Sequence, residues 1–236
     1  MINGKSAMTD NEGQKYDLIA AGFAEMRDSF HMEQKYIDLL LKELPPKSHI
    51  LDIGCGSGYP IASYLIKNGT NVTGVDSSRE LLKIATTKCP EMHQIYGDIR
   101  TVEINQKFDG IIEWWCLFHI PKEDHEKMIT RFASWLKIGG ILEFTTGDKE
   151  YAATSSSMLN QELAFYSLDP ALYEKYLLNN GFKILLREND QDEHLAHQGV
   201  KCSLNTSHTH QYLLLQPLND FFKRLILNDS FVGLNN

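Results

Sequence analysis

Three glycines at alternate positions give this sequence its clearest chemical signal. Gly54, Gly56 and Gly58 follow an apolar run at 49–53, and Asp76 ends a second apolar run at 71–76. Because glycine has no Cβ, a ligand can lie directly on the backbone of such a turn, where the first N–H groups of the next helix point toward it. A carboxylate at the end of the neighbouring strand is placed to accept hydrogen bonds from ribose hydroxyls. The pattern therefore predicts a pocket for a nucleoside with a charged tail.

The acid before the glycines and the spacing of the glycines distinguish a dinucleotide from a nucleoside that carries an amino acid. Dinucleotide folds favour Gly-x-Gly-x-x-Gly, because a pyrophosphate sits on the helix N-terminus. Here the spacing is Gly-x-Gly-x-Gly, and it follows Asp52, whose carboxylate would repel a pyrophosphate but accept the ammonium of an amino acid. In both features the chain resembles the class I S-adenosylmethionine (SAM)-dependent methyltransferases. The resemblance implies that SAM is the cofactor and that it contacts Asp52, the three glycines, Asp76 and Ser77.

Further motifs follow in the order of that family. The run 94–99 reads as a short strand and a turn, and the resemblance implies that Asp98 takes the adenine amino group while the N–H of Ile99 meets the ring. Glu113 and Trp114 lie in a fourth strand, within 108–115, and are also expected to contact the cofactor. This strand and a fifth at 139–146 are apolar enough for the buried centre of a parallel sheet. The resemblance covers residues 45–203.

The whole pattern predicts an α/β fold with a Rossmann-like, seven-stranded, mostly parallel sheet, helices on both faces and a C-terminal antiparallel hairpin. Helical spacing and Pro-Pro predict a helix at 33–44, and Ser77-x-x-Glu80 reads as a capping box that opens another. Further helices are expected to begin at Pro121 and after Asp169. The final pair of strands is expected at 182–186 and 195–202.

The segments outside this core are expected to select the substrate. Residues 1–44 form an N-terminal helical cover, in which Tyr16 can face the cofactor and Arg27 can reach its carboxylate; an ordinary amphipathic helix is the alternative. Residues 45–203 form the SAM-binding core, within which the segment 147–168 can shape a pocket. Residues 204–236 form an extension with an amphipathic helix after Pro217. Its apolar stripe is expected to cover the protein's own core or to form a homodimer contact.

His119 is the histidine that the motif order places near the transferred methyl group. A histidine can act as a base near neutral pH, so His119 is the candidate catalytic residue, with a backbone hydrogen bond or a helix cap as the alternative. Four other histidines lie close in sequence at irregular spacings, and no regular ligand pattern completes them. We therefore expect no metal site among His194, His197, His208 and His210.

Composition limits the partners. With 31 acidic and 23 basic residues the net charge is −8, and the sequence has no cluster of Lys and Arg of the kind that binds nucleic acid. The start of the chain is polar, and no apolar run reaches the length of about 18 residues that a membrane span needs. The four cysteines are scattered, which is typical of reduced thiols. A cytoplasmic protein without membrane or nucleic-acid partners is expected.

The sequence therefore predicts a methyltransferase that moves the SAM methyl group to a small molecule by in-line displacement. One alternative is a methyltransferase-like regulatory protein that binds SAM without turnover. A second is a NAD-linked oxidoreductase, against which Asp52 and the glycine spacing stand. The identity of the acceptor atom stays open.

Overall fold

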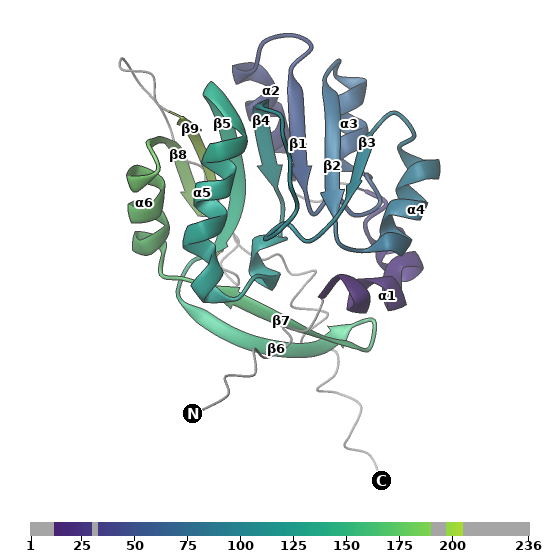
Figure 1. Cartoon of the computed structure of the whole chain (residues 1–236). Helices are drawn as coiled ribbons and strands as arrows, with labels where there is room; N and C mark the ends of the chain where they lie inside the picture. The colour runs from purple at the N-terminus through teal and green to yellow at the C-terminus, as the bar shows by residue number, and fades with distance from the viewer. Residues whose placement is uncertain (1–11, 30–32, 190–196, 205–236) are drawn as a thin grey trace, which may run out of the picture.

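A computed structural model describes residues 12–29, 33–189 and 197–204 (Figure 1). Its main sheet has seven strands in the order β3-β2-β1-β4-β5-β9-β8. Their bounds are β1 His49–Ile53, β2 Asn71–Asp76, β3 His93–Tyr96, β4 Phe108–Glu113, β5 Leu136–Gly147, β8 Phe182–Asn189 and β9 His197–Leu204. The strand order reverses at β1, because β2 and β4 lie on its two sides. In sheets of this type, ligands bind beyond the carboxyl ends of the strands at such a reversal.

The directions of the strands confirm the predicted α/β class. Strands β3, β2, β1, β4 and β5 pair in parallel, whereas β9 pairs antiparallel with both β5 and β8. The sheet is thus mostly parallel and ends in an antiparallel hairpin, with parallel pairing confined to five of its seven strands. The register places Asp52 of β1 opposite Gly74 of β2 and Ile112 of β4.

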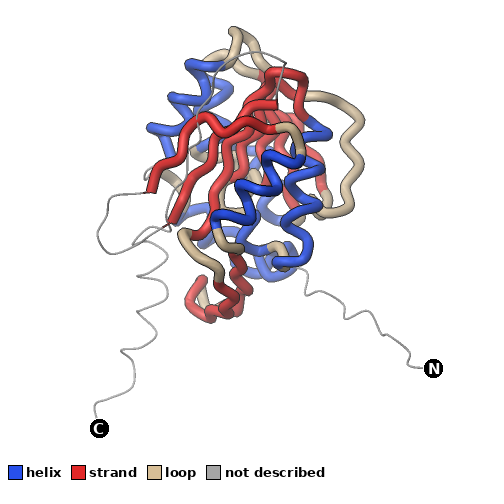
Figure 2. The backbone as a smooth tube through the Cα atoms, turned by 90° about the vertical axis from the view of Figure 1, so that its left-hand side faces the viewer, coloured by secondary structure: helices blue, strands red, loops and turns tan. Residues whose placement is uncertain are grey.

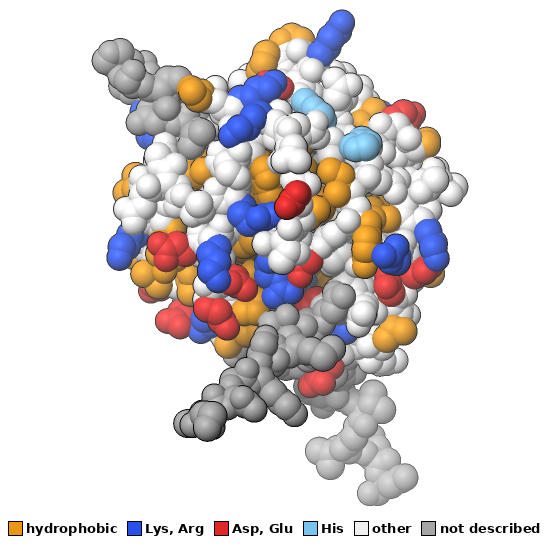
Figure 3. All heavy atoms as spheres, in the orientation of Figure 1, with side chains coloured by type: hydrophobic (Ala, Val, Ile, Leu, Met, Phe, Trp, Pro, Cys, Tyr) orange, Lys and Arg blue, Asp and Glu red, His pale blue; other side chains and the backbone are white. Residues whose placement is uncertain are grey.

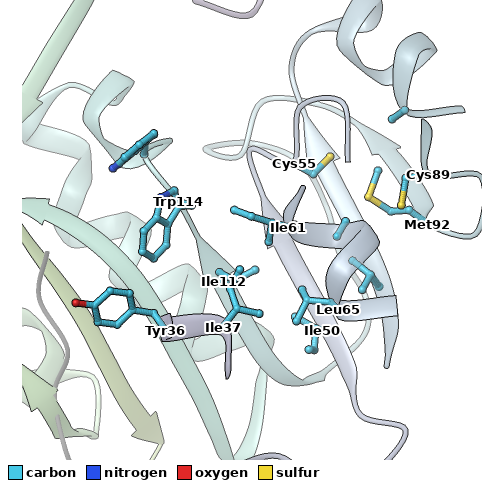
Figure 4. Close-up of a cluster of buried hydrophobic side chains, with 14 of the residues drawn as sticks. Tyr36, Ile37, Ile50, Cys55, Ile61, Leu65, Cys89, Met92, Ile112 and Trp114 are labelled. Carbon is cyan, nitrogen blue, oxygen red and sulfur yellow. The ribbon is translucent and has the colours of Figure 1, made fainter. Parts of the chain in front are cut away.

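Alternate residues of each strand pack on opposite faces of the sheet, and each face is covered by helices (Figure 2). Ile50 joins a core with α2 (Glu33–Glu43), α3 (Ile61–Lys67) and α4 (Arg79–Lys88), part of which Figure 4 shows. Leu51 joins a second core with α5 (His125–Trp135) and α6 (Pro170–Asn179). Burial on both faces explains why the central strands are continuous apolar runs.

Two helix starts differ from the sequence prediction. Helix α4 is capped by Ser78, whose Oγ accepts the N–H of Leu81 at 3.1 Å, so the predicted capping box from Ser77 is wrong by one residue. The chain after Pro121 first forms a 3₁₀ turn, η2 (Lys122–Asp124), and α5 begins only at His125. The start of α6 is as predicted, because Asp169 caps it by accepting the N–H of Ala171 at 2.9 Å.

A cover lies across the carboxyl ends of the parallel strands (Figure 1). It consists of α1 (Glu12–Met26) and a separate two-stranded antiparallel sheet, β6 (Tyr151–Met158) and β7 (Gln161–Ser167). The segment 147–168 was expected to shape a pocket, but its strands were not predicted. The tip of this hairpin packs on α1, since a Cβ on Gly22 would lie 2.9 Å from Cδ1 of Leu159.

One face of the molecule carries charges of both signs. Lys and Arg side chains lie among Asp, Glu and hydrophobic side chains on the face shown in Figure 3. Within the ranges that the structure describes, no helix has both the length and the apolar character needed to cross a membrane. The predicted C-terminal helix after Pro217 lies outside the described residues, as do His194, His208, His210 and the side chain of His197.

Candidate active site

A cavity of about 250 Å³ opens at the carboxyl ends of β1, β2 and β4, beneath the cover. It brings together most of the residues that the sequence singled out. These are Tyr16, Arg27, Asp52, Gly54, Gly56, Asp76, Ser77, Asp98, Ile99, Trp114 and His119. Gly58 and Glu113 are not among the lining residues.

The glycine turn has two different functions in the packing. A Cβ on Gly56, where φ is +53°, would find its nearest neighbours at 4.0 Å, so the backbone is open toward the cavity. A Cβ on Gly58, where φ is +71°, would lie 2.8 Å from the Cβ of Cys89. Gly58 therefore allows the turn to pack on α4 and its C-terminal cap, rather than facing a ligand as the sequence analysis expected.

Asp76 ties the glycine turn to the next strand and helix. Its Oδ2 accepts the N–H of Gly56 at 2.8 Å, and its Oδ1 accepts the N–H of Ser78 at 2.7 Å. Burial raises the pKa of this carboxyl group, while the backbone donors oppose that rise. Each carboxylate oxygen has a second lone-pair site, so Asp76 can still accept hydrogen bonds from a ligand.

Asp52 is a buried acid among other acids. It is 3% exposed and lines the cavity. Burial raises its pKa to about 7, and the negative charges of Asp76 and Glu113 add to the rise. A cation brought beside Asp52 would relieve this repulsion, because an opposite charge favours the ionised form. The floor of the cavity is thus suited to a positively charged group.

Two buried hydrogen-bond donors in the cavity wall have no partner among the described residues. They are Nη1 of Arg27 and Nε1 of Trp114. The other terminal nitrogen of Arg27, Nη2, forms an ion pair with Glu33, and the guanidinium lies over the ring of Trp115 at 5.0 Å. Unpaired buried donors cost free energy, and an anion in the cavity can accept a hydrogen bond from such a donor. The cavity therefore offers a place for an anion as well as a place for a cation.

Glu113 organises the turn after β4 instead of contacting a ligand. It is fully buried, and its Oε1 accepts the N–H groups of Cys116 at 2.5 Å and Leu117 at 2.7 Å. Its Oε2 accepts the N–H of Thr145 at 3.2 Å. Burial raises the pKa of Glu113 to about 7, against the effect of these donors. The sequence predicted that Glu113 contacts the cofactor. In the structure Glu113 does not line the cavity, and it holds the backbone that follows Trp114.

Asp98 and Ile99 lie at the cavity edge beside an arginine that the motif did not single out. Arg100 donates to Asp98 through Nε at 3.0 Å and through Nη2 at 2.5 Å. Burial by itself raises the pKa of Asp98, but hydrogen bonds from Arg100 lower it overall. Arg131 of α5 donates to the carbonyl of Ile99 at 2.9 Å and fixes this loop. The Ile99 N–H and the Asp98 carboxylate are thus held at one end of the cavity.

His119 has its protonation state fixed by its two partners. Its Nδ1 lies 2.9 Å from the carbonyl oxygen of Ala164 in β7, and its Nε2 lies 3.0 Å from the hydroxyl of Tyr16 in α1. A carbonyl can only accept, so Nδ1 carries the proton, and Nε2 accepts the hydrogen bond of the Tyr16 hydroxyl. Burial lowers the pKa of His119 to about 4. His119 is therefore a neutral ring with an accepting nitrogen in the cavity.

Some lining residues were not singled out from the sequence. They are Phe23 of α1, Tyr59 of the glycine turn and Ala164 of β7. Tyr166 of β7 lies in the segment 147–168 that was expected to shape a pocket, and it also lines the cavity. The alternation of Ala164 and Tyr166 is the signal that could have located Ala164, but it requires knowing that 161–167 is a strand.

Comparison with known proteins shows what this arrangement is similar to. Residues 50–140 match a family model described as a methyltransferase domain. The chain is 32% identical over 131 residues to a ubiquinone biosynthesis O-methyltransferase of Coxiella burnetii, a match that covers 53% of this chain and 55% of the relative. The chain thus spans about half the length of the curated relatives it matches in that organism.

Solved methyltransferase structures have the same fold as this chain. A SAM-dependent methyltransferase from Clostridium acetobutylicum has a TM-score of 0.65 and 18% identity, covering 79% of this chain and 99% of that chain. A magnesium protoporphyrin IX methyltransferase from Synechocystis, solved with bound SAM, has a TM-score of 0.63 and 20% identity, covering 84% and 99%. These likenesses establish the α/β fold with its mostly parallel sheet.

Proposed function

We propose that this protein transfers the methyl group of SAM to a small molecule. The observation that carries the proposal is that the cavity wall presents both an acid that suits a cation and unpaired donors that suit an anion. Asp52 suits the ammonium of the SAM amino acid, and the unpaired donors of Arg27 and Trp114 suit its carboxylate. Asp76 has lone pairs left for the ribose hydroxyls, and Asp98 with Ile99 lies where the adenine would sit. The ammonium, the carboxylate, the ribose and the adenine of SAM thus each have a complementary group in the cavity.

The same residues fit a dinucleotide poorly. A pyrophosphate on the glycine turn would lie beside Asp52 and Asp76, two carboxylates that no described cation pairs with. The donors that suit an anion belong to Arg27 and Trp114, which come from the cover and from the end of β4. NAD-linked hydride transfer is therefore the weaker hypothesis.

SAM supplies an electrophilic methyl group on a sulfonium whose leaving group is neutral. The residues of the chain then have to hold the acceptor in line with the sulfur and exclude water. Alignment of this kind contributes about 7 to 11 kcal/mol in well-oriented systems. The aromatic ring of Tyr16, which lines the cavity, can stabilise the sulfonium by a cation–π contact.

A hydroxyl is the acceptor group that the site favours. The phenol of Tyr16 already donates to Nε2 of His119, so an acceptor hydroxyl can make the same bond once Tyr16 turns aside. His119 would then receive the proton, as a base would, or orient the hydroxyl. The O-methyltransferase named among the relatives supports this choice.

The test begins with cofactor binding and proceeds to turnover. Calorimetry with S-adenosylhomocysteine (SAH) and with NADH should show tight binding of SAH alone. Incubation with SAM and catechol as a probe acceptor, followed by mass spectrometry, should show a product heavier by one methyl group. SAH binding without methylation of catechol, other phenols or amines would favour the regulatory alternative, and tighter binding of NADH would overturn the cofactor assignment.

The organisation of the chain is proposed on the same basis. Residues 1–44 act as the cover, 45–203 as the core that binds SAM, and 204–236 as an extension whose apolar stripe suits self-docking or a homodimer contact. A cytoplasmic location is supported by the free thiols of Cys55, Cys89 and Cys116. Small molecules, and neither nucleic acid nor membrane, are the proposed partners.

A further inference from the structure

A second histidine–tyrosine pair lies behind the cavity wall. His125 is fully buried at the start of α5, and Tyr173 of α6 is 2% exposed. Nδ1 of His125 lies 2.7 Å from the hydroxyl of Tyr173, and its Nε2 lies 2.7 Å from the carbonyl oxygen of Ile120. The Tyr173 hydroxyl also accepts the N–H of Leu168 at 3.2 Å. Four segments of the chain meet at these two side chains.

The chemistry of the partners fixes the direction of every hydrogen bond. The carbonyl of Ile120 can only accept, so Nε2 of His125 carries the proton and Nδ1 must accept. Tyr173 therefore donates its hydroxyl hydrogen to Nδ1 and accepts from Leu168. Burial lowers the pKa of His125 to about 4, so the ring is neutral as this arrangement requires. Every polar atom of the pair is satisfied, with no hydrogen bond left for a ligand on the imidazole.

The two ends of this chain of hydrogen bonds reach two walls of the cavity. Ile120 and the following Pro121 line the cavity directly. Leu168 comes one residue after the end of β7, the strand that contributes Ala164 and Tyr166 to the lining. Neither His125 nor Tyr173 lines the cavity itself. Their position lets them set how far apart the two walls lie.

We propose that His125 and Tyr173 are positioning residues for the methyl acceptor. They hold the Ile120–Pro121 turn against the exit of β7, and so they place the wall that carries Tyr166 and the carbonyl that orients His119. The groups assigned to SAM are Arg27, Asp52, Asp76, Asp98, Ile99 and Trp114, and the hydrogen bonds of the pair go to Ile120 and Leu168 instead. The pair therefore affects how the acceptor is positioned and does not affect the binding of the cofactor. This inference rests on the proposed function.

Tyr173→Phe tests the proposal with the loss of one oxygen atom. The ring is retained, including its edge contact with Phe144 at 6.1 Å, so the core keeps its volume. Tyr176→Phe is the matched control, because Tyr176 is half-buried on the same helix and takes no part in this network. His125→Gln is a second variant that retains an acceptor and a donor at the same position.

Three measurements separate the outcomes: SAH affinity by calorimetry, amide hydrogen exchange of residues 161–168 by mass spectrometry, and the KM for catechol. In Tyr173→Phe we expect SAH affinity within twofold of wild type. Amide exchange at 161–168 should be at least tenfold faster, and the KM for catechol should be about fivefold higher. All three quantities should be unchanged in Tyr176→Phe. Unchanged exchange, or a loss of SAH affinity equal to the rise in KM, would overturn the proposal. If the wild-type protein binds SAH but does not methylate catechol, the proposed acceptor fails, and the exchange measurement still decides whether the pair positions the wall.

Discussion

Asp17 of the cover helix α1 caps the N-terminus of a different helix, α4. Its Oδ1 accepts a hydrogen bond from the hydroxyl of Ser78 at 2.6 Å and one from the N–H of Glu80 at 3.0 Å. Ser78 in turn accepts the N–H of Leu81, so the first turn of α4 is satisfied by two side chains from two elements. This contact holds α1 beside Asp76 and Ser77, at the ribose end of the cavity.

Asp17→Ala should loosen the cover. Loss of a capping carboxylate costs about 1 kcal/mol of folding stability, and a cover that is less often closed should weaken SAH binding by about tenfold. Thermal unfolding and calorimetry measure the two effects. Glu25→Ala, an exposed change on the same helix, is the control and should alter neither. Equal SAH affinity in Asp17→Ala and the control would mean that α1 does not close over the cofactor.

Asp76→Ala should remove the ribose contact. A hydrogen bond to a charged group contributes about 1.5 to 3 kcal/mol, so the Kd for SAH should rise by about 30-fold or more. Because Asp76 also holds the N–H of Gly56, Asp76→Asn is measured beside it to preserve the size of the side chain. Calorimetry that finds wild-type affinity in a folded Asp76→Ala protein would contradict the ribose assignment.

The binding of SAM should strengthen as pH rises through 7. Burial and neighbouring acids hold the pKa of Asp52 at about 7 in the empty cavity, so its carboxylate is ionised only above that pH. The ionised form is the one that attracts the ammonium of the ligand. Asp52→Asn should flatten this dependence in calorimetry between pH 6 and pH 8. A pH dependence that persists in Asp52→Asn would assign the titration to another group, with Glu113 the next candidate.

The raised pKa of Asp52 also affects the folding stability of the protein without ligand. The pKa of Asp52 is raised from its ordinary value of 3.8, so the folded state binds a proton more tightly than the unfolded state. Stability contributed by this group is therefore present below the unfolded pKa and is lost as pH rises from about 4 toward 7. Chemical denaturation at pH 8 should find Asp52→Asn more stable than wild type. SAM or SAH should reduce that difference.

The parts of the fold that the sequence predicted are those with local signals. The apolar runs at β1, β2 and β4 and the proline and glycine boundaries of α2 and α6 specify their elements directly. The hairpin β6–β7 gave no such signal, because residues 152–157 are Ala, Thr and Ser and include no large apolar side chain. Its place in the fold depends on contacts with α1 and η1 (Leu117–His119), far away in sequence.

The site residues also divide into those with a local sequence signal and those without one. Spacing located Asp52 and Asp76 at the cavity, because the ends of parallel strands meet at one edge of a sheet, and the motif order located His119. It did not distinguish Glu113, whose strand-end position is the same but whose carboxylate turns to backbone N–H groups. The hydrogen bond between Tyr16 and His119 joins residues 103 positions apart, and no local pattern specifies it.

Removal of residues 205–236 tests the role of the C-terminal extension. The stripe formed by Leu218, Phe221, Phe222, Leu225 and Ile226 has helical spacing, and full burial of each large side chain would contribute about 1.5 to 3 kcal/mol. The truncated protein should therefore unfold at a lower temperature or lose a dimer in light scattering, while SAH binding is retained. An unchanged melting temperature together with an unchanged mass would show that the extension contributes to neither.

The proposed role of His119 gives the sharpest test of mechanism. Gln at this position keeps hydrogen-bonding capacity and removes the titrating nitrogen, so His119→Gln should lower turnover by about 100-fold while SAH affinity is retained. The pKa of His119 is lowered to about 4 by burial, so wild-type turnover at saturating SAM should fall only as pH drops toward 4, when Nε2 becomes protonated and can no longer accept. That acidic limb should be absent in His119→Gln. Tyr16→Phe, which frees Nε2 by removing the phenol that now donates to it, should retain the limb and the turnover of the wild type. Wild-type turnover in His119→Gln would instead reduce His119 to the residue that links α1 to β7.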